Sequence, residues 1–312
     1  MKKCLICYDD LPKDKDYYHD ACIKNSLLKN INPLVPYNFE ELYDLGRQII
    51  QNSFSVTGVQ TKISMTTSED SNPKQFTLIG YKSNYILKPP SKHYPMMPEN
   101  EDLTMKLARI AKIPTVSQTL VPMMSGEIAY ITERMDRTEF NKKIHMEDMA
   151  QISNKLTEHK YLGSAEQVGK KIYAFSENKM FDVITYFDLI VFCLITGNAD
   201  MHLKNFSLIY TENGIRLAPA YDLLNTKIVT KDEDESALTV DGKKKNITLK
   251  NLNRLASALR IPDKARDNIY NKYSRLYPTF ILWVNKSLLD DDLKNYYARY
   301  LNTMTERFGF KS

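Results

Sequence analysis

The sequence predicts an α+β fold with a β-rich first half and a mostly helical second half. Apolar and polar residues alternate over 59–65, the first of several short runs typical of half-buried strands. After about residue 135 the apolar residues recur at helical spacing, most clearly over 179–196. A chain of 312 residues is long enough for about two domains and a substantial core.

The expected elements follow the chain in order. In the first half we expect a helix at 39–51, strands at 59–65, 75–79, 84–88, 115–121 and 127–133, and a helix at 100–112. In the second half we expect helices at 179–196, 248–259, 263–286 and 289–307, strands at 206–210 and 215–218, and an exposed polar loop at 230–246. The predicted parts are a short Cys/His segment (1–35), a β-rich lobe (36–135) and a helical lobe (136–312).

Composition excludes several classes of protein. Charged residues make up 26% and apolar residues 43%, which is near the average for globular proteins. The net charge of +5 is mild and neither demands nor excludes a nucleic-acid partner, but the basic residues are dispersed, so we expect no direct binding of nucleic acid. The apolar run 189–195 is too short to span a bilayer, which needs about 20 residues. The N-terminus turns acidic where a secretory signal is apolar. We expect a cytoplasmic protein with no membrane partner, and export into a host cell stays open.

Glycine is scarce. The chain has ten glycines, about 3% of its residues against a usual ~7%. Their positions fit neither G-x-G-x-x-G nor G-x-x-x-x-G-K-[ST], so the two commonest phosphate-binding loops are excluded.

The segment 197–208 (GNADMHLKNFSL) carries the clearest chemical pattern. Asp200 and Asn205 have the spacing D-x-x-x-x-N, and a second acid, Asp222, follows the predicted hairpin. Phosphoryl transfer needs a carboxylate that deprotonates the attacking hydroxyl and oxygen ligands that hold Mg²⁺ beside the phosphates. Either acid alone is more simply a turn or cap residue, but the two together favour phosphoryl transfer.

The first half supplies a complementary lysine. Lys88 ends the apolar run 85–88, and a lysine that faces the interior needs a carboxylate or a bound anion beside it. Glu101 is the expected partner, with Asp102 as the competing candidate. Upstream, the loop 53–62 contains one glycine, Gly58, and can cover phosphates with backbone N–H groups.

Seven motifs in chain order resemble the HipA family of bacterial serine/threonine protein kinases, which are toxins of toxin–antitoxin systems. They are SVTGVQTK (55–62), ILKP (86–89), Asn100-Glu101 with MKLA (105–108), ITERMDR (131–137), EDMAQ (147–151), GNADMHLKNFSL (197–208) and LAPAYDLL (217–224). The resemblance covers about 53–224. The short N-terminal region is similar to that of the HipT branch.

The resemblance implies a two-lobed protein-kinase-like fold that uses ATP and Mg²⁺. It implies that Asp200 is the catalytic base, with His202 near the γ-phosphate, and that Asn205 and Asp222 bind Mg²⁺. Nucleotide-binding positions implied by the match are Ser55, Val56, Gly58, Lys62, Lys88, Glu101, Glu133, Met135 and Lys204, with Glu133 and Met135 in the hinge beside adenine. Ser53 and Ser55 match loop serines that such kinases autophosphorylate. Met135 stands where the family usually has Phe, and Thr61 where it often has Glu or Pro.

The resemblance also implies partners. These are a protein substrate, expected to be an aminoacyl-tRNA synthetase, and antitoxins that are a HipB-like DNA-binding protein and a HipS-like small protein. The alternatives are a related kinase with another protein or a small-molecule substrate, and an inactive kinase-like interaction module. The intact residues Lys88, Asp200, Asn205 and Asp222 argue against the inactive module.

A second pattern lies at the N-terminus. Cys4-x₂-Cys7-x₁₁-His19-x₂-Cys22 has the residue types and spacing of a tetrahedral Cys₃His zinc site. A packed cysteine cluster or a redox-labile pair are the alternatives. A closed site of four protein ligands leaves no open position, so we expect a structural, regulatory or docking role.

Overall fold

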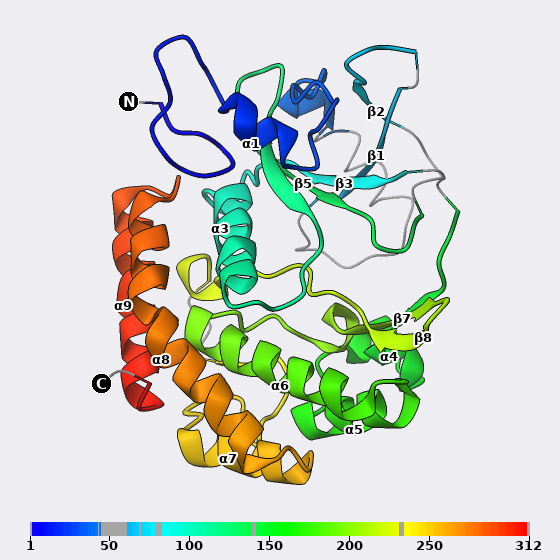
Figure 1. Cartoon of the computed structure of the whole chain (residues 1–312), viewed down its shortest axis with the longest axis vertical. Helices are drawn as coiled ribbons and strands as arrows, with labels where there is room; N and C mark the ends of the chain where they lie inside the picture. The colour runs from blue at the N-terminus through cyan, green and yellow to red at the C-terminus, as the bar shows by residue number, and fades with distance from the viewer. Residues whose placement is uncertain are drawn as a thin grey trace. The chain divides into compact units, whose positions relative to one another are not determined.

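The computed structural model describes residues 2–42, 44, 61–68, 70–78, 83–138, 142–230 and 234–310 (Figure 1). The chain divides into two compact units. The first unit contains Met1–Asp102, Val116–Lys143 and Lys286–Leu289, and the second contains Leu103–Thr115, Ile144–Asn285 and Asp290–Ser312. None of the helices in the described ranges has the length and apolar character needed to cross a membrane.

The first unit contains a five-stranded antiparallel sheet. Its strands lie in the order β2 (Phe76–Leu78), β1 (Ile63–Thr67), β3 (Tyr85–Lys88), β5 (Ile128–Glu133) and β4 (Gln118–Pro122). In the register of β3 and β5, Lys88 lies opposite Tyr130 and Tyr85 lies opposite Glu133. Every residue of β4 is buried. The sheet thus fixes Lys88 at the end of its strand.

The N-terminal segment packs against this sheet. The Tyr18 hydroxyl donates to the backbone carbonyl of Leu120 in β4 at 2.9 Å. The backbone N–H of Leu5 donates to the carbonyl of Tyr17 at 2.9 Å, so two stretches of the segment are held together ahead of the short helix α1 (Asp20–Lys24). The Lys3 ammonium donates to the carbonyl of Lys286 at 2.7 Å. The first residues are therefore part of the first unit.

The second unit is mostly helical. Its main helices are α5 (Ala165–Phe175), α6 (Lys179–Thr196), α7 (Leu249–Ala258), α8 (Asp263–Lys286) and α9 (Asp291–Arg307). A small antiparallel sheet has the order β6 (Met146–Asp148), β7 (Ser207–Thr211) and β8 (Gly214–Leu217), next to the short α4 (Met149–Ile152). Three short 3₁₀ helices are η1 (Thr157–His159), η2 (Leu203–Asn205) and η3 (Thr226–Ile228). The remaining helix, α3 (Met97–Ile110), is divided between the units after Asp102.

Helix α6 forms the centre of the second unit. Every residue over 189–196 is buried, as expected of a helix that is apolar on all sides. It lies beside α5 (Figure 1) and also packs against α9. Phe192 meets Phe280 of α8 edge to face, with ring centroids 6.2 Å apart. Because helices cover α6 along its length, its C-terminal end is held firmly.

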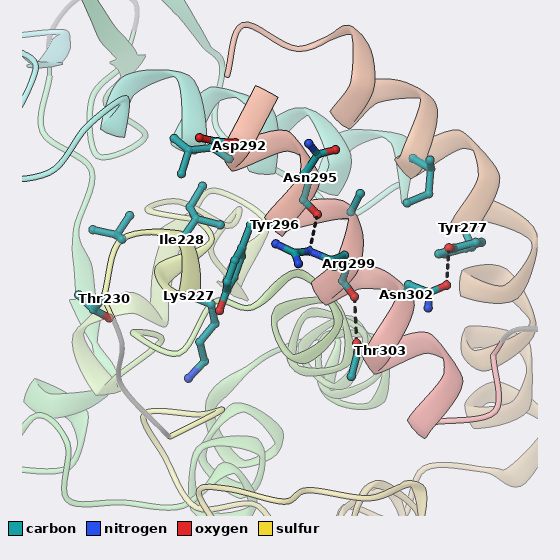
Figure 2. Close-up of a pocket in the computed structure, with 14 residues that line it drawn as sticks. Lys227, Ile228, Thr230, Tyr277, Asp292, Asn295, Tyr296, Arg299, Asn302 and Thr303 are labelled. Atoms are coloured by element: carbon teal, nitrogen blue, oxygen red, sulfur yellow. Dashed lines mark hydrogen bonds between the residues drawn. The ribbon is translucent and has the colours of Figure 1, made fainter. Parts of the chain in front are cut away.

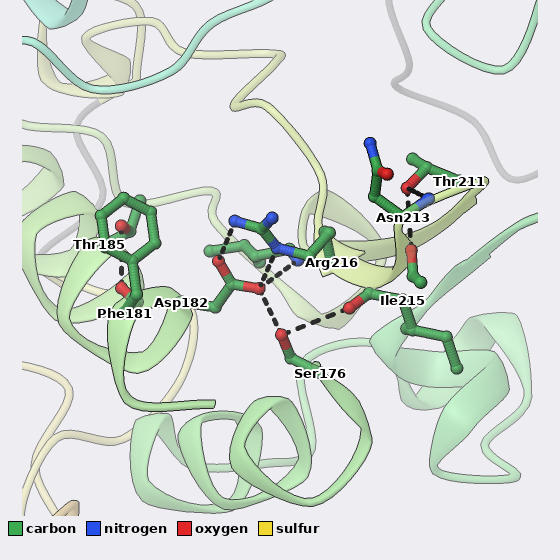
Figure 3. Close-up of polar contacts among 10 residues, drawn as sticks. Ser176, Phe181, Asp182, Thr185, Thr211, Asn213, Ile215 and Arg216 are labelled. Carbon is green, nitrogen blue, oxygen red and sulfur yellow. Dashed lines mark hydrogen bonds and ion pairs between the residues drawn. The ribbon is translucent and has the colours of Figure 1, made fainter. Parts of the chain in front are cut away.

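A buried carboxylate joins the other end of α6 to the small sheet (Figure 3). Asp182 accepts a hydrogen bond from the backbone N–H of Leu217 at 2.9 Å and one from the Ser176 hydroxyl. The Arg216 guanidinium also approaches it, with Nε at 3.3 Å. These contacts fix the β7–β8 hairpin against the start of α6. The segments before and after this hairpin carry the predicted catalytic acids.

The expected elements that lie in the described ranges are found with shifts at their ends, but one segment was wrongly expected to be an exposed loop and several elements were not expected. The segment 230–246 was expected to be an exposed loop, but Ala237, Leu238 and Val240 in its described part are buried. Glu235 is also buried, accepts from the backbone N–H of Ile247 at 2.9 Å and pairs with Arg307. The flanking charged runs concealed this short apolar stretch. Strand β6 and helices α1, α4 and α5 were not expected, and most of the expected helix 39–51 lies outside the described residues.

Gly197 provides a test of how α6 ends. It has φ +76°, and a Cβ there would lie 2.8 Å from Asn225 Oδ1. Gly242 has a similar φ of +75° but nothing within 4 Å of an added Cβ. We expect Gly242→Ala to lower the free energy of unfolding by about 1 kcal/mol, the cost of backbone strain alone. Gly197→Ala should cost roughly 2–3 kcal/mol in urea unfolding because the clash is added. Equal costs would contradict this account.

Candidate active site

The loop between α6 and β7 brings two of the predicted residues together. The backbone carbonyl of Asp200 accepts two hydrogen bonds, from the N–H of His202 at 2.8 Å and from the Asn205 side-chain amide at 2.9 Å. Asn198 Oδ1 accepts from the N–H of Asp200 at 3.2 Å. The loop is therefore closed on itself, with Asp200 and Asn205 adjacent despite the four residues between them.

Thr226 holds the start of this loop. Its backbone N–H donates to the carbonyl of Gly197 at 2.9 Å, and its hydroxyl donates to the same carbonyl at 3.0 Å. The same hydroxyl oxygen accepts from the N–H of Ala199 at 3.0 Å. Helix η3 thus fixes the backbone that leads to Asp200.

Asp222 is held in place through its neighbour. The hydroxyl of the half-buried Tyr221 donates to the carbonyl of Lys204 at 2.9 Å and lies 2.7 Å from the Ser207 hydroxyl. Asp222 itself has φ +55°, a conformation that costs energy for a residue other than glycine. Such strain is concentrated at functional sites. Tyr221 therefore brings the strained Asp222 to the loop that carries Lys204 and Asn205.

His202 is a buried imidazole. Burial lowers its pKa, and the negative charges of Asp200 and Asp222 oppose that change only in part. In the part of the chain that the structure covers, its Nδ1 atom has no hydrogen-bond partner. The lowered pKa favours the neutral form of the His202 imidazole.

Sequence reasoning missed Tyr161. Its hydroxyl donates to Asp200 Oδ1 at 2.7 Å, and its ring packs edge to face on His202 with centroids 5.1 Å apart. No motif surrounds Tyr161, which lies 39 residues before Asp200, so no local signal could have found it. The contact occupies one of the two carboxylate oxygens of Asp200 and orients the other.

Sequence reasoning also did not predict Asp148 as a site residue. It caps α4 by accepting from the N–H of Gln151 at 2.9 Å, and its second oxygen pairs with the Lys204 ammonium at 3.1 Å. The Gln151 side-chain oxygen in turn accepts from the backbone N–H of Asp148 at 2.9 Å, which completes a capping box. The EDMAQ motif thus builds a helix start whose carboxylate holds Lys204.

In the first unit, Lys88 and Glu101 form a buried ion pair. Lys88 Nζ lies 2.5 Å from Glu101 Oε1, and the two side chains are 4% and 1% exposed. The ammonium also lies 5.3 Å from the centroid of the Tyr130 ring. Asp102, the competing candidate, instead accepts a hydrogen bond from the Tyr8 hydroxyl. The pair therefore joins the end of β3 to the first turns of α3.

The other predicted residues of the first unit lie at or near strand ends or outside the described residues. Glu133 ends β5 and donates its backbone N–H to the carbonyl of Ser117 at 2.9 Å. Met135 is half-buried two residues later, and Lys62 is exposed just before β1. Ser53, Ser55, Val56 and Gly58 lie outside the described residues.

A groove in the second unit contains none of the predicted site residues (Figure 2). Its volume is about 1070 Å³, and α9, α8 and η3 line it, with Lys227, Tyr277, Tyr296 and Arg299 among the polar contributors. Its lining includes a carboxylate, Asp292, and the amides of Asn295 and Asn302, but these residues lie on α9 and belong to none of the motifs found in the sequence. Volume alone therefore does not locate the chemistry in this chain.

The arrangement of a buried Lys–Glu pair on a sheet and helix, with a D-x-x-x-x-N loop and a second acid after a hairpin, is that of a protein-kinase-like fold. The sequence pattern of the family described as "HipA-like C-terminal domain" matches residues 54–278. The chain therefore belongs to the HipA-like C-terminal domain family, which confirms the predicted family and fold class.

Similar proteins and a similar solved structure are consistent with this family. A Haemophilus influenzae protein named "Putative kinase" is 30% identical over 209 residues, which are 63% of this chain and 60% of that protein. The serine/threonine-protein kinase toxin HipA of Shewanella oneidensis is 26% identical over 81% of this chain and 63% of its own length. The chain thus spans about 60% of the length of these relatives. A solved complex of Shewanella oneidensis HipA with HipB and operator DNA shares the fold, with a TM-score of 0.70 and 22% identity over 88% of this chain and 72% of that one.

The buried pair predicts an asymmetric response to mutation. We expect Lys88→Met to lower the free energy of unfolding by ~3–5 kcal/mol, because Glu101 is left buried without its partner. Adding Glu101→Gln to that variant should recover part of the loss. As a control, Lys92→Met breaks the exposed pair of Lys92 with Glu40 and should cost about 0–1 kcal/mol. Urea unfolding would measure all three, and similar losses for Lys88→Met and Lys92→Met would contradict the prediction.

Glu99, in the first turn of α3, predicts a pH dependence. Burial raises the pKa of Glu99 to about 7, and the negative charge of Asp102 adds to the rise. The ordinary pKa in the unfolded chain is ~4.3. The folded chain therefore binds more protons between about pH 4.3 and pH 7, so the free energy of unfolding falls as pH rises through this range. Glu99→Gln should remove this part of the pH dependence in urea unfolding, whereas Glu158→Gln at an exposed position should retain it.

Proposed function

We propose that this protein is an ATP-dependent serine/threonine protein kinase that acts as the toxin of a bacterial toxin–antitoxin system. The observation that carries the proposal is the closed loop in which the Asn205 amide holds the Asp200 carbonyl. With this hydrogen bond in place, the Asp200 carboxylate and the Asn205 amide oxygen belong to neighbouring side chains. One is a potential base and the other is a potential metal ligand. Phosphoryl transfer requires such a base beside such a metal ligand.

In this proposal Asp200 is the catalytic base. The hydroxyl oxygen of a serine or threonine attacks the γ-phosphorus of ATP, the bond from that phosphorus to the β–γ bridging oxygen breaks, and ADP leaves. The hydroxyl proton passes to Asp200. Tyr161, which donates to one oxygen of Asp200, orients the carboxylate so that the other oxygen can accept this proton. His202 stays neutral beside the base.

Asn205 and Asp222 are the proposed ligands of Mg²⁺. The Asn205 amide nitrogen is engaged by the Asp200 carbonyl, so its oxygen is the atom suited to a metal. Oxygen groups of this kind are the preferred ligands of Mg²⁺. A bound Mg²⁺ ion would supply charge neutralisation at the phosphates. Tyr221 supports both ligands by fixing Asp222 to the backbone of Lys204 and to Ser207.

Lys88 is the proposed contact for the ATP phosphates. A buried ammonium is stable only when it is paired, and Glu101 supplies the pairing carboxylate in the structure. Glu133 and Met135 are proposed to lie beside adenine, and Lys62 and Lys204 to add positive charge at the phosphates. Ser55, Val56 and Gly58 would cover the phosphates.

The proposed target is a protein, and we infer an aminoacyl-tRNA synthetase, whose phosphorylation would block translation. The proposed antitoxin partners are a HipB-like DNA-binding protein and a HipS-like small protein. The support for the HipB-like partner is that the related HipA was solved with HipB and operator DNA. Autophosphorylation is proposed at Ser53 and Ser55. A phosphate there adds a charge of about −1.5 to −2 and would repel ATP.

Intact-mass measurement tests the activity. The purified chain is treated with a phosphatase, freed of it, and incubated with Mg²⁺ and ATP. We expect the native chain and Asp14→Asn, a change at an exposed position, to gain phosphate. Asp200→Asn should gain none within the same time, because loss of the base lowers the rate by about 10²-fold or more.

Two outcomes would count against the kinase proposal. One is that the native chain gains no phosphate and also fails to phosphorylate added protein substrates. The other is that Asp200→Asn gains phosphate as fast as Asp14→Asn does. If the native chain gains phosphate, phosphopeptide mapping of the product locates the modified serines.

A further inference from the structure

Four side chains that the proposed kinase chemistry does not use meet in the N-terminal segment. They are Cys4, Cys7, His19 and Cys22, and their ligand atoms all lie within 4.8 Å of one another. Three sulfurs and one imidazole nitrogen at such distances can surround a single ion. We propose that these residues bind one Zn²⁺ ion in a closed tetrahedral site that stabilises the first unit.

The orientation of His19 supports a metal ligand. Its Nδ1 atom lies 3.4 Å from Cys7 Sγ and 3.9 Å from Cys22 Sγ. On the other side of the ring, Nε2 lies 3.2 Å from the backbone carbonyl of Asp10. A carbonyl can only accept, so Nε2 carries the proton and the lone pair of Nδ1 faces the sulfurs. Histidines that bind metals have this arrangement, with one nitrogen on the ion and the other on a carbonyl or carboxylate.

The backbone presents the four ligands from two short turns. Cys4 and Cys7 lie in a turn closed by the N–H of Tyr8, which donates to the carbonyl of Cys4 at 2.9 Å. His19 caps the start of α1, and the N–H of Cys22 donates to its carbonyl at 3.0 Å. The hydrogen bond from the Leu5 N–H to the Tyr17 carbonyl holds the two turns together. The site is thus built by backbone structure.

The alternatives fit these observations less well. All three cysteines are free, so no disulfide accounts for their proximity. Only Cys4 is buried, whereas Cys7, His19 and Cys22 are half-buried, so they do not form an apolar cluster. Zn²⁺ bound to three thiolates and one imidazole would add to the stability that this segment gains from packing on the first unit. Binding releases the thiol protons to solvent.

The proposed site supports α3. Tyr8, the residue after Cys7, is buried with φ +66°, a strained conformation for a tyrosine. Its hydroxyl donates to Asp102, which is adjacent in sequence to Glu101 of the buried ion pair. All of these residues belong to the first unit. A metal that fixes the Cys4–Cys7 turn therefore also fixes the side chain that holds the first turns of α3.

Metal analysis of the full-length chain tests the proposal. The native protein is purified without an affinity tag. Inductively coupled plasma mass spectrometry should then find about one Zn²⁺ per chain. Cys7→Ser and Cys22→Ser should lose most of the zinc. The matched control is Cys193→Ser, which changes a buried cysteine of α6 outside the cluster and should retain zinc at the native level.

A second measurement keeps the test decisive if the ligand variants do not fold. The native chain is stripped of metal with a chelator and titrated with Co²⁺. We expect thiolate-to-cobalt charge-transfer absorption and the visible bands of a tetrahedral ion, both lost when Zn²⁺ is added. A native chain that contains less than about a tenth of an equivalent of zinc and binds neither added ion would overturn the proposal. Zinc retained in both cysteine variants would overturn it as well.

Discussion

The burial of α6 is the constraint on which the proposed catalytic loop depends. Helices α5, α8 and α9 contact it, and its start is fixed to β8 by Asp182. The last turn of α6 is buried, so the residue that ends it must adopt a positive φ where there is no room for a side chain. Gly197 is that residue. Thr226 then fixes the following backbone, and the Asp200 carbonyl gathers His202 and Asn205. The position of the acid is thus a consequence of packing around one apolar helix.

The first unit depends on two carboxylates that are buried beside hydrogen-bond donors. Glu101 and Asp102 are neighbours in α3, yet they turn to different partners, Lys88 of β3 and Tyr8 of the N-terminal segment. Each contact removes a carboxylate from water, and the hydrogen bond that it accepts offsets this cost. Together they tie the sheet, the helix and the cysteine turn to the same short stretch of chain. Lys88 is therefore held by more than its own strand, and a change in the cysteine turn should reach α3 through Tyr8.

Sequence reasoning succeeded where the signal is local. The strand that ends at Lys88, the apolar helix α6 and the spacing of Asp200 and Asn205 are all visible in short windows. It failed for 230–246, because the charged runs outweigh three buried apolar residues in any local average. It could not find Tyr161, since a contact across 39 residues leaves no periodic trace. It also could not decide whether Glu101 or Asp102 pairs with Lys88, because two adjacent acids at the start of a helix have the same local pattern.

By itself the sequence determined the fold class, the family and the chemical types at the candidate sites, because periodicity, residue type and spacing are local properties of the chain. Only the tertiary structure decided which acid pairs with Lys88, that Tyr161 orients Asp200, and that Tyr221 brings Asp222 to the loop of Asn205. It also decided that His19 turns Nδ1 toward the cysteine sulfurs. These are contacts between distant segments, and their geometry follows from how the core packs and from which buried polar groups find partners.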